Sequence, residues 1–129
     1  MPEPRFQIEN FKQLQGQPCP CGLAKRAFTS EPEKTATIHL VEISQSTLVH
    51  YHKRTTEIYY ILEGSGKIQL DAQIFDVEPG MTVMIKPGCR HRAIGKMKIL
   101  NIPVPAFDPT DEFFDNDPDG NVIPPLKGT

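Results

Sequence analysis

From residue 35 to residue 104 the chain alternates short apolar, β-branched segments with turns rich in glycine and proline. No apolar period of 3.6 residues is sustained here, so the pattern favours strands over helices. The expected strands are residues 35–43, 47–52, 58–62, 67–70, 74–77, 81–85, 91–94 and 97–104, with a tight hairpin turn at Gly64-Ser65-Gly66 and another turn at 71–73. Seven or eight short strands predict one all-β domain, either a sandwich or a closed barrel.

The two ends of the chain do not follow this alternation. Residues 1–28 are expected to form an irregular N-terminal extension, with one or two helical turns around residues 8–14, and residues 29–105 to form the barrel. Residues 106–129 form a tail rich in proline and acidic side chains. Phe113 and Phe114 are expected to hold this tail against the barrel or against a second subunit.

Composition narrows the functional classes. The chain has 129 residues, 13 prolines, 9 glycines and a formal net charge of -2. This charge gives no reason to expect nucleic-acid binding, and no helical DNA-binding unit is apparent. Neither a membrane span nor a signal peptide is evident, so we expect a cytoplasmic protein.

Cysteine usage agrees with a reducing compartment, because the chain has three cysteines, an odd number. Cys19-Pro20-Cys21 supplies only two of the usual four zinc ligands, with Cys89 as a conceivable third. Ordinary thiols are the favoured interpretation of these residues.

Three of the four histidines fall in two short stretches of the strand-rich region. His50 and His52 would share one face of a strand, because side chains at i and i+2 point the same way. Glu57 follows a turn, and His91 follows Pro87-Gly88. Three imidazoles and a carboxylate suit iron, manganese, nickel, cobalt or zinc, with a coordination position left open. The alternative is that these are surface histidines or hydrogen-bonded core histidines.

These residues also resemble a known family. His50-x-His52, Glu57 and Gly64 are similar in spacing to the first cupin motif, and Gly80, Pro87-Gly88 and His91 to the second. Three positions depart from the motifs, and none of them is a metal ligand: Ser44, Lys86 and Gly95.

The resemblance covers residues 35–104 and implies a double-stranded β-helix, the cupin jelly-roll barrel, with irregular N- and C-terminal extensions. It further implies a divalent metal in the barrel mouth, held by His50, His52, Glu57 and His91, and a homodimer with the chain ends packed across its interface.

The resemblance leaves the reaction open. One hypothesis is a metal-dependent enzyme acting on a small organic metabolite, with dioxygenase, decarboxylase or isomerase chemistry. The other is a non-catalytic module that uses its metal to bind or sense a small ligand. Three further residues are candidates to contact the metal ligands or the substrate: Tyr59, His39 and Cys89. Each has a structural alternative, namely a packed aromatic ring, a hydrogen-bonded strand histidine and an unreactive thiol.

The substrate pocket is expected to be small and hydrophobic, with Met81, Val83, Ile85 and Ile99 near it. Lys53 and Arg54 could attract an anion, but a solvated turn is the favoured interpretation. A sugar-phosphate enzyme ranks lower, because the strands carry few lysines and arginines to converge on a phosphate.

Overall fold

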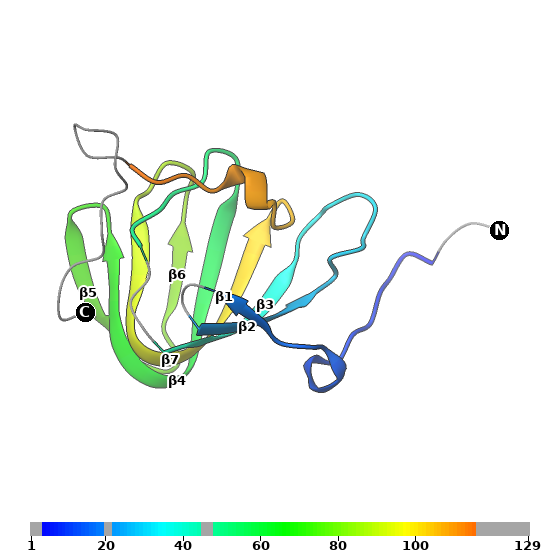
Figure 1. Ribbon diagram of the computed structural model, residues 1–129, viewed down its shortest axis with the longest axis horizontal. Coiled ribbons are helices and arrows are strands. Elements are labelled where there is room, and N and C mark those ends of the chain that lie inside the picture. Colours follow the sequence, from blue (N-terminus) through cyan, green and yellow to red (C-terminus); the bar gives the residue numbers. More distant parts are fainter. Residues whose placement is uncertain (1–3, 20–21, 45–47, 116–129) are drawn as a thin grey trace.

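The computed structural model describes residues 4–19, 22–44 and 48–115. It confirms an all-β fold, in which the described strands belong to one antiparallel sheet in the order β1-β2-β3-β7-β4-β5, with β6 paired to β4 (Figure 1). The elements are η1 (Phe11–Gln13), β1 (Gln17–Cys19), β2 (Gly22–Ala27), β3 (Ile38–Ile43), β4 (Thr56–Leu70), β5 (Gln73–Val77), β6 (Thr82–Ile85), β7 (His91–Val104) and η2 (Pro109–Asp111). No helix among the described residues has the length and apolar character needed to cross a membrane.

Two long strands, β4 and β7, form the centre of the fold. They pair from Thr56 opposite Val104 to Leu70 opposite His91, with a register shift between Ile61 and Glu63. Both strands curve sharply and run through the two halves of the barrel (Figure 1). One half of β4 pairs with β6 and the other half with β5. The prediction of separate strands at 58–62 and 67–70, and at 91–94 and 97–104, is therefore wrong.

The glycines at the centre of β4 explain this error. Gly64 has φ +78°, and a Cβ atom there would lie 2.4 Å from the backbone oxygen of Lys96. A Cβ atom on Gly66 would lie 2.3 Å from the backbone oxygen of Ile94. The two backbones approach more closely than any side chain permits, so Gly64-Ser65-Gly66 is a bend inside a continuous strand. The predicted hairpin turn at these residues does not exist.

The N-terminal extension is more regular than predicted. β1 and β2 add to the sheet through β3, so the expectation of irregular structure is wrong for residues 17–19 and 22–27. The buried side chains of β2 are Ala24 and Ala27. Alanine is a weak strand former, which hid this strand in the sequence pattern.

Two smaller expectations also need correction. Within the described residues the predicted strand 47–52 reduces to isolated bridges at His50 and Tyr51, and Thr47 lies outside them. Cys19 is disulfide-bonded, so it is not an ordinary thiol, whereas Cys89 is free. Cys21 lies outside the described residues. The cysteines therefore no longer support the expectation of a reducing compartment.

The hydrophobic core fills the space between the two halves of the barrel. Its most buried members, at 2% exposure or less, are Ile61, Ile68, Ile85 and Ile99. Val83 packs against this core, whereas Met81 is 40% exposed. Of the four residues predicted near the substrate pocket, Ile99 lines the cavity beside the predicted metal ligands, and the other three do not.

The start of the C-terminal tail lies on the barrel. Tyr51 and Phe113 exchange two backbone hydrogen bonds of 2.9 Å, and their rings lie 5.7 Å apart. Phe113 thus contacts the barrel in the described structure, whereas residues 116–129 lie outside the described part. The Arg54 side chain is 65% exposed and pairs with Asp108, as a solvated turn predicts.

Asp111 fixes the tail more firmly than the aromatic rings do. Its carboxylate is 2% exposed and accepts hydrogen bonds from the backbone N–H groups of Lys53, Arg54 and Thr55. The Thr55 hydroxyl donates a further bond of 3.0 Å. The loop before β4 thus takes its shape around one buried carboxylate.

Alanine substitutions at glycines test the bend in β4. We expect Gly64→Ala to lower the free energy of unfolding by about 3–5 kcal/mol, because it adds both backbone strain and a clash. Gly80→Ala is the matched control, since Gly80 has φ +96° and nothing within 4 Å of an added Cβ. This control should cost only the strain, about 1–2 kcal/mol. Equal losses in urea unfolding would contradict the close-approach explanation.

Removal of the Asp111 carboxylate tests how the loop is held. We expect Asp111→Ala to cost about 3–5 kcal/mol, because three backbone donors lose their acceptor in a partly buried site. Asp108→Ala removes a neighbouring but exposed acid and should cost about 1 kcal/mol. Thermal and urea unfolding of both variants measure the difference, and similar losses would count against the buried carboxylate.

Candidate metal centre

The structure brings the four predicted ligands together. The side-chain ligand atoms of His50, His52, Glu57 and His91 all lie within 4.8 Å of one another. Glu57 is the second residue of β4 and His91 the first residue of β7, while both other histidines precede β4. The backbones of His50 and His91 exchange hydrogen bonds of 3.1 and 2.9 Å, which places their side chains next to each other.

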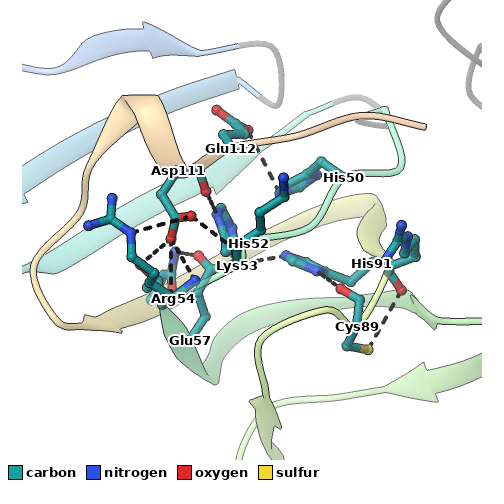
Figure 2. Close-up of polar contacts among 12 residues, drawn as sticks. His50, His52, Lys53, Arg54, Glu57, Cys89, His91, Asp111 and Glu112 are labelled. Atoms are coloured by element: carbon teal, nitrogen blue, oxygen red, sulfur yellow. Dashed lines mark hydrogen bonds and ion pairs between the residues drawn. The ribbon is translucent and has the colours of Figure 1, made fainter. Parts of the chain in front are cut away.

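Each imidazole of this cluster is oriented by a backbone carbonyl, and Figure 2 shows this for His52 and His91. The Nδ1 atoms of His50, His52 and His91 lie 2.9, 2.7 and 2.9 Å from the carbonyl oxygens of Leu48, Asp111 and Cys89, respectively. A carbonyl only accepts, so each Nδ1 carries the proton and donates it. The Nε2 atoms are left for the interior of the cluster, which is the orientation that metal ligation through Nε2 requires.

Glu57 lies where these Nε2 atoms converge, and it is 5% exposed. Its Oε1 lies 2.8 Å from Nε2 of His91 and 2.9 Å from Nε2 of His52. Its Oε2 accepts a hydrogen bond of 2.6 Å from Asn101. A buried carboxylate next to imidazole nitrogens needs a positive charge between them, supplied by protons or by a metal cation.

A divalent metal fits this arrangement. His52 Nε2 is buried without a hydrogen-bond partner, because Glu57 is close to it but not in hydrogen-bonding direction. Three imidazole nitrogens and one carboxylate oxygen form a donor set that divalent transition metals prefer. The site therefore suits a divalent metal on the chemistry of its own residues.

Burial and the single carboxylate of Glu57 determine the pKa shifts within the cluster. Burial lowers the pKa of His50 to about 4, with repulsion from His91 adding to the effect. Burial also lowers the pKa of His52, but contact with Glu57 outweighs it and raises that pKa to about 9. Burial raises the pKa of Glu57, yet the two adjacent imidazoles reverse this and hold it well below its usual value. In the absence of a metal, a proton on His52 thus supplies the positive charge that Glu57 requires.

Tyr59 and His39 both line the cavity beside the cluster. Tyr59 is 8% exposed, and its ring lies 6.3 Å from that of His91. His39 Nε2 lies 3.0 Å from the Thr37 hydroxyl, and burial together with the charge of Arg26 lowers its pKa to about 4. His39 is therefore a neutral, hydrogen-bonded imidazole that faces the cavity.

Cys89 contributes through its backbone. Its carbonyl orients His91, whereas its thiol contacts the Arg90 carbonyl oxygen at 3.7 Å. Burial and the nearby Asp71 raise the pKa of the thiol, which disfavours the reactive thiolate.

Four residues that contribute to the site have no signal in the sequence. Asn101 holds Glu57, and Asp111 holds His52 through its carbonyl. Glu112 places Oε1 3.9 Å from Nε2 of His50, and burial raises its pKa. Arg26 lines the cavity from β2. Each reaches the site through strand register or tail docking, which a pattern along one segment does not reveal.

The metal cluster opens into a cavity of about 170 Å³. Much of its wall is apolar, formed by Ala24, Val41, Ile43, Leu48, Ala93, Ile99, Phe107 and Phe114. Arg26 is the one arginine or lysine among the described lining residues, and the acids are Glu57 and Glu112. The cavity thus has the mostly apolar wall of a ligand pocket, and at about 170 Å³ it is smaller than the roughly 300–1,000 Å³ of pockets for drug-sized molecules.

Comparison with known proteins places the chain in a family. Residues 38–102 match the model of the cupin domain, which is half of the chain. An uncharacterized protein of Methanocaldococcus jannaschii is 40% identical over 76 residues, which are 56% of this chain and 61% of that protein. The chain thus spans less than two thirds of the length of this relative.

Solved structures agree with this assignment. A protein from Planctomyces limnophilus superposes with a TM-score of 0.77 at 33% identity, covering 88% of this chain and 97% of the other. The Streptomyces nucleoside dehydratase Pac13 has a TM-score of 0.72 at 16% identity, with coverage of 84% and 89%, and shows likeness of fold alone. By its matched domain, its jelly-roll architecture and its extensive likeness to a solved structure, the chain belongs to the cupin family.

Proposed function

We propose that this cupin is a metal-dependent enzyme that acts on a small organic metabolite, with dioxygenase-like or decarboxylase- or isomerase-like chemistry. The observation that carries the proposal is the convergence of three oriented imidazoles and one carboxylate within 4.8 Å, beside a cavity of about 170 Å³. A structural metal would be enclosed by its ligands, whereas this donor set leaves room for substrate.

The residues of the site have distinct tasks in this proposal. His50, His52, Glu57 and His91 would hold the metal, which when bound polarises a carboxylate, hydroxyl or carbonyl group or activates dioxygen. The carbonyls of Leu48, Asp111 and Cys89 keep the imidazoles aimed before the metal arrives, so little reorganisation is needed. The apolar wall excludes water and strengthens electrostatic contacts with the substrate.

The comparisons support an enzyme without specifying one. A protein of the same fold is named as a nucleoside dehydratase, which demonstrates that a jelly-roll barrel of this size accommodates a catalytic pocket. A shared fold does not show that this chain acts on the same substrate.

Single alanine substitutions at the four ligands test the metal centre. We expect His52→Ala and Glu57→Ala to weaken metal binding at least about 10–100-fold and to abolish turnover, because each removes a donor from the set. His39→Ala is the matched control, a buried histidine in the same cavity but outside the cluster. Metal analysis after dialysis gives the result. Full metal retention by the ligand variants, or equal loss by His39→Ala, would overturn the proposed centre.

Oxygen uptake by the metal-loaded protein separates the two kinds of chemistry. Consumption of oxygen with a small acid supports a dioxygenase, and product formation without it supports decarboxylase or isomerase chemistry. Saturable, metal-dependent ligand binding with no product would instead identify a binding or sensing module.

We also propose that the protein is a homodimer. Phe6 is 70% exposed and Ile8 is 85% exposed, and both lie on an N-terminal segment that extends away from the sheet (Figure 1). Large apolar side chains left uncovered near each other favour contact with another surface. In the proposal a second copy of the chain covers them.

Light scattering tests this assembly. We expect the wild type to have twice the chain mass of 14.5 kDa, and Phe6→Asp with Ile8→Asp to shift it to the monomer, because two charges would be buried in the contact. Met84→Asp, at a side chain 61% exposed on β6, is the control and should remain dimeric. A wild-type monomer, or a double variant that remains dimeric, would contradict the proposal.

A further inference from the structure

The guanidinium group of Arg26 forms no salt bridge with a described residue, and its charge acts on Glu112 only at longer range. Its side chain lines the cavity, and its Nε atom is buried with no hydrogen-bond partner. Among the described residues its contact of note is the Phe107 ring, 5.0 Å from the guanidinium carbon. A cation in a mostly apolar cavity is costly unless an anion or a hydrogen-bond acceptor joins it. The metal centre does not use this group, so its charge is available to a ligand.

Strand register places Arg26 in line with the site. Arg26 lies opposite His39, His39 opposite Asn101, and Asn101 opposite Tyr59. Residues directly opposite one another on antiparallel strands share a face of the sheet, so these side chains form one row across β2, β3, β7 and β4. Glu57, two residues before Tyr59, projects from the same face of β4. The row therefore leads from Arg26 to the edge of the metal cluster.

A second unused polar atom lies in this row. The carboxylate of Glu57 only accepts hydrogen bonds, so Asn101 must turn its NH2 group toward it. The carbonyl oxygen of that amide, Oδ1, is then left buried without a donor. The row thus offers one unpaired cationic donor and one unpaired neutral acceptor, with neutral His39 between them.

We propose that Arg26 binds the carboxylate of a small organic acid, whose hydroxyl or amino group donates to Asn101 Oδ1 beside the metal centre. This inference rests on the proposed function, and it names the substrate class and the residue that selects it. Such a ligand satisfies both orphaned atoms at once, and a guanidinium pairs well with a carboxylate in an apolar setting.

The charges around the cavity favour a carboxylate over a phosphate. Arg26 is the one arginine or lysine among the described lining residues, and two acids, Glu57 and Glu112, line the same space. A phosphate carries more negative charge, and one cation beside two acids balances it poorly. A cavity of about 170 Å³ also limits the ligand to a few non-hydrogen atoms.

Calorimetric titration of the Co²⁺-loaded full chain tests the inference. The probes are lactate, propionate, which lacks the hydroxyl group, propane-1,2-diol, which lacks the carboxylate, and inorganic phosphate. We expect wild type to bind lactate with a Kd of about 1 mM or tighter. Arg26→Met should weaken lactate and propionate binding about tenfold or more and leave the diol unchanged, while Arg26→Lys should retain part of the affinity. Arg54→Met, at an exposed arginine outside the cavity, should match wild type.

The outcomes separate this inference from the proposed function. Co²⁺ affinity is measured first, and a wild-type protein that binds no Co²⁺ overturns both. Normal Co²⁺ binding with equal lactate affinity in wild type and Arg26→Met overturns only the role of Arg26. Failure of wild type to bind either acid, or tighter binding of phosphate than of lactate, overturns the substrate class and leaves the metal centre standing.

Discussion

The site depends on the bend in the longest strand pair. Glu57 lies opposite Pro103 near one end of the β4–β7 ladder, and His91 lies opposite Leu70 at the other end. Thirteen residues of straight strand would separate these two positions by about 43 Å. Their ligand atoms are nevertheless 2.8 Å apart, because both strands fold back on themselves around Gly64, Gly66 and Gly95. The glycines that permit the close approach of the two backbones therefore also create the metal cluster.

The cluster is in turn coupled to the tail through one residue. The carboxylate of Asp111 holds the loop that leads from His52 to β4, and its backbone carbonyl accepts the Nδ1 proton of His52. The conformation of the tail and the orientation of a metal ligand thus rest on the same contact. A metal that binds more tightly when the docked tail orients His52 also stabilises the docked tail. Metal binding and docking of the tail are therefore thermodynamically linked.

The ligands were predictable from sequence, while their supporting residues were not. His50 and His52 share a face because of the two-residue period of extended backbone, and the turn before His91 directed it to the same place. Asn101, Arg26 and Asp111 act through register and tail docking, which only the folded chain specifies. Gly64-Ser65-Gly66 was misread because glycines serve a hairpin turn and a strand bend equally well, and only packing against β7 decides between them. The alanines of β2 gave no strand signal, so a strand that carries a cavity residue was missed.

Charged side chains lie at both ends of the row of residues that runs from Arg26 to Glu57 along the cavity. At one end, Glu57 and Glu112 stand among imidazoles whose protonation or metal occupancy compensates them. At the other end, Arg26 stands against an aromatic ring and forms no salt bridge with a described residue, although its charge acts on Glu112 at longer range. Stability alone would not select a lone guanidinium next to apolar walls, since an apolar side chain of similar volume would fill the space at lower cost. A buried polar atom without a hydrogen-bond partner is expected where a ligand supplies that partner. Three such atoms, on Arg26, Asn101 and His52, belong to residues that line one cavity. Two of these atoms define where a small acid would bind and the third where a metal would bind, so a small acid beside a bound metal accounts for all three.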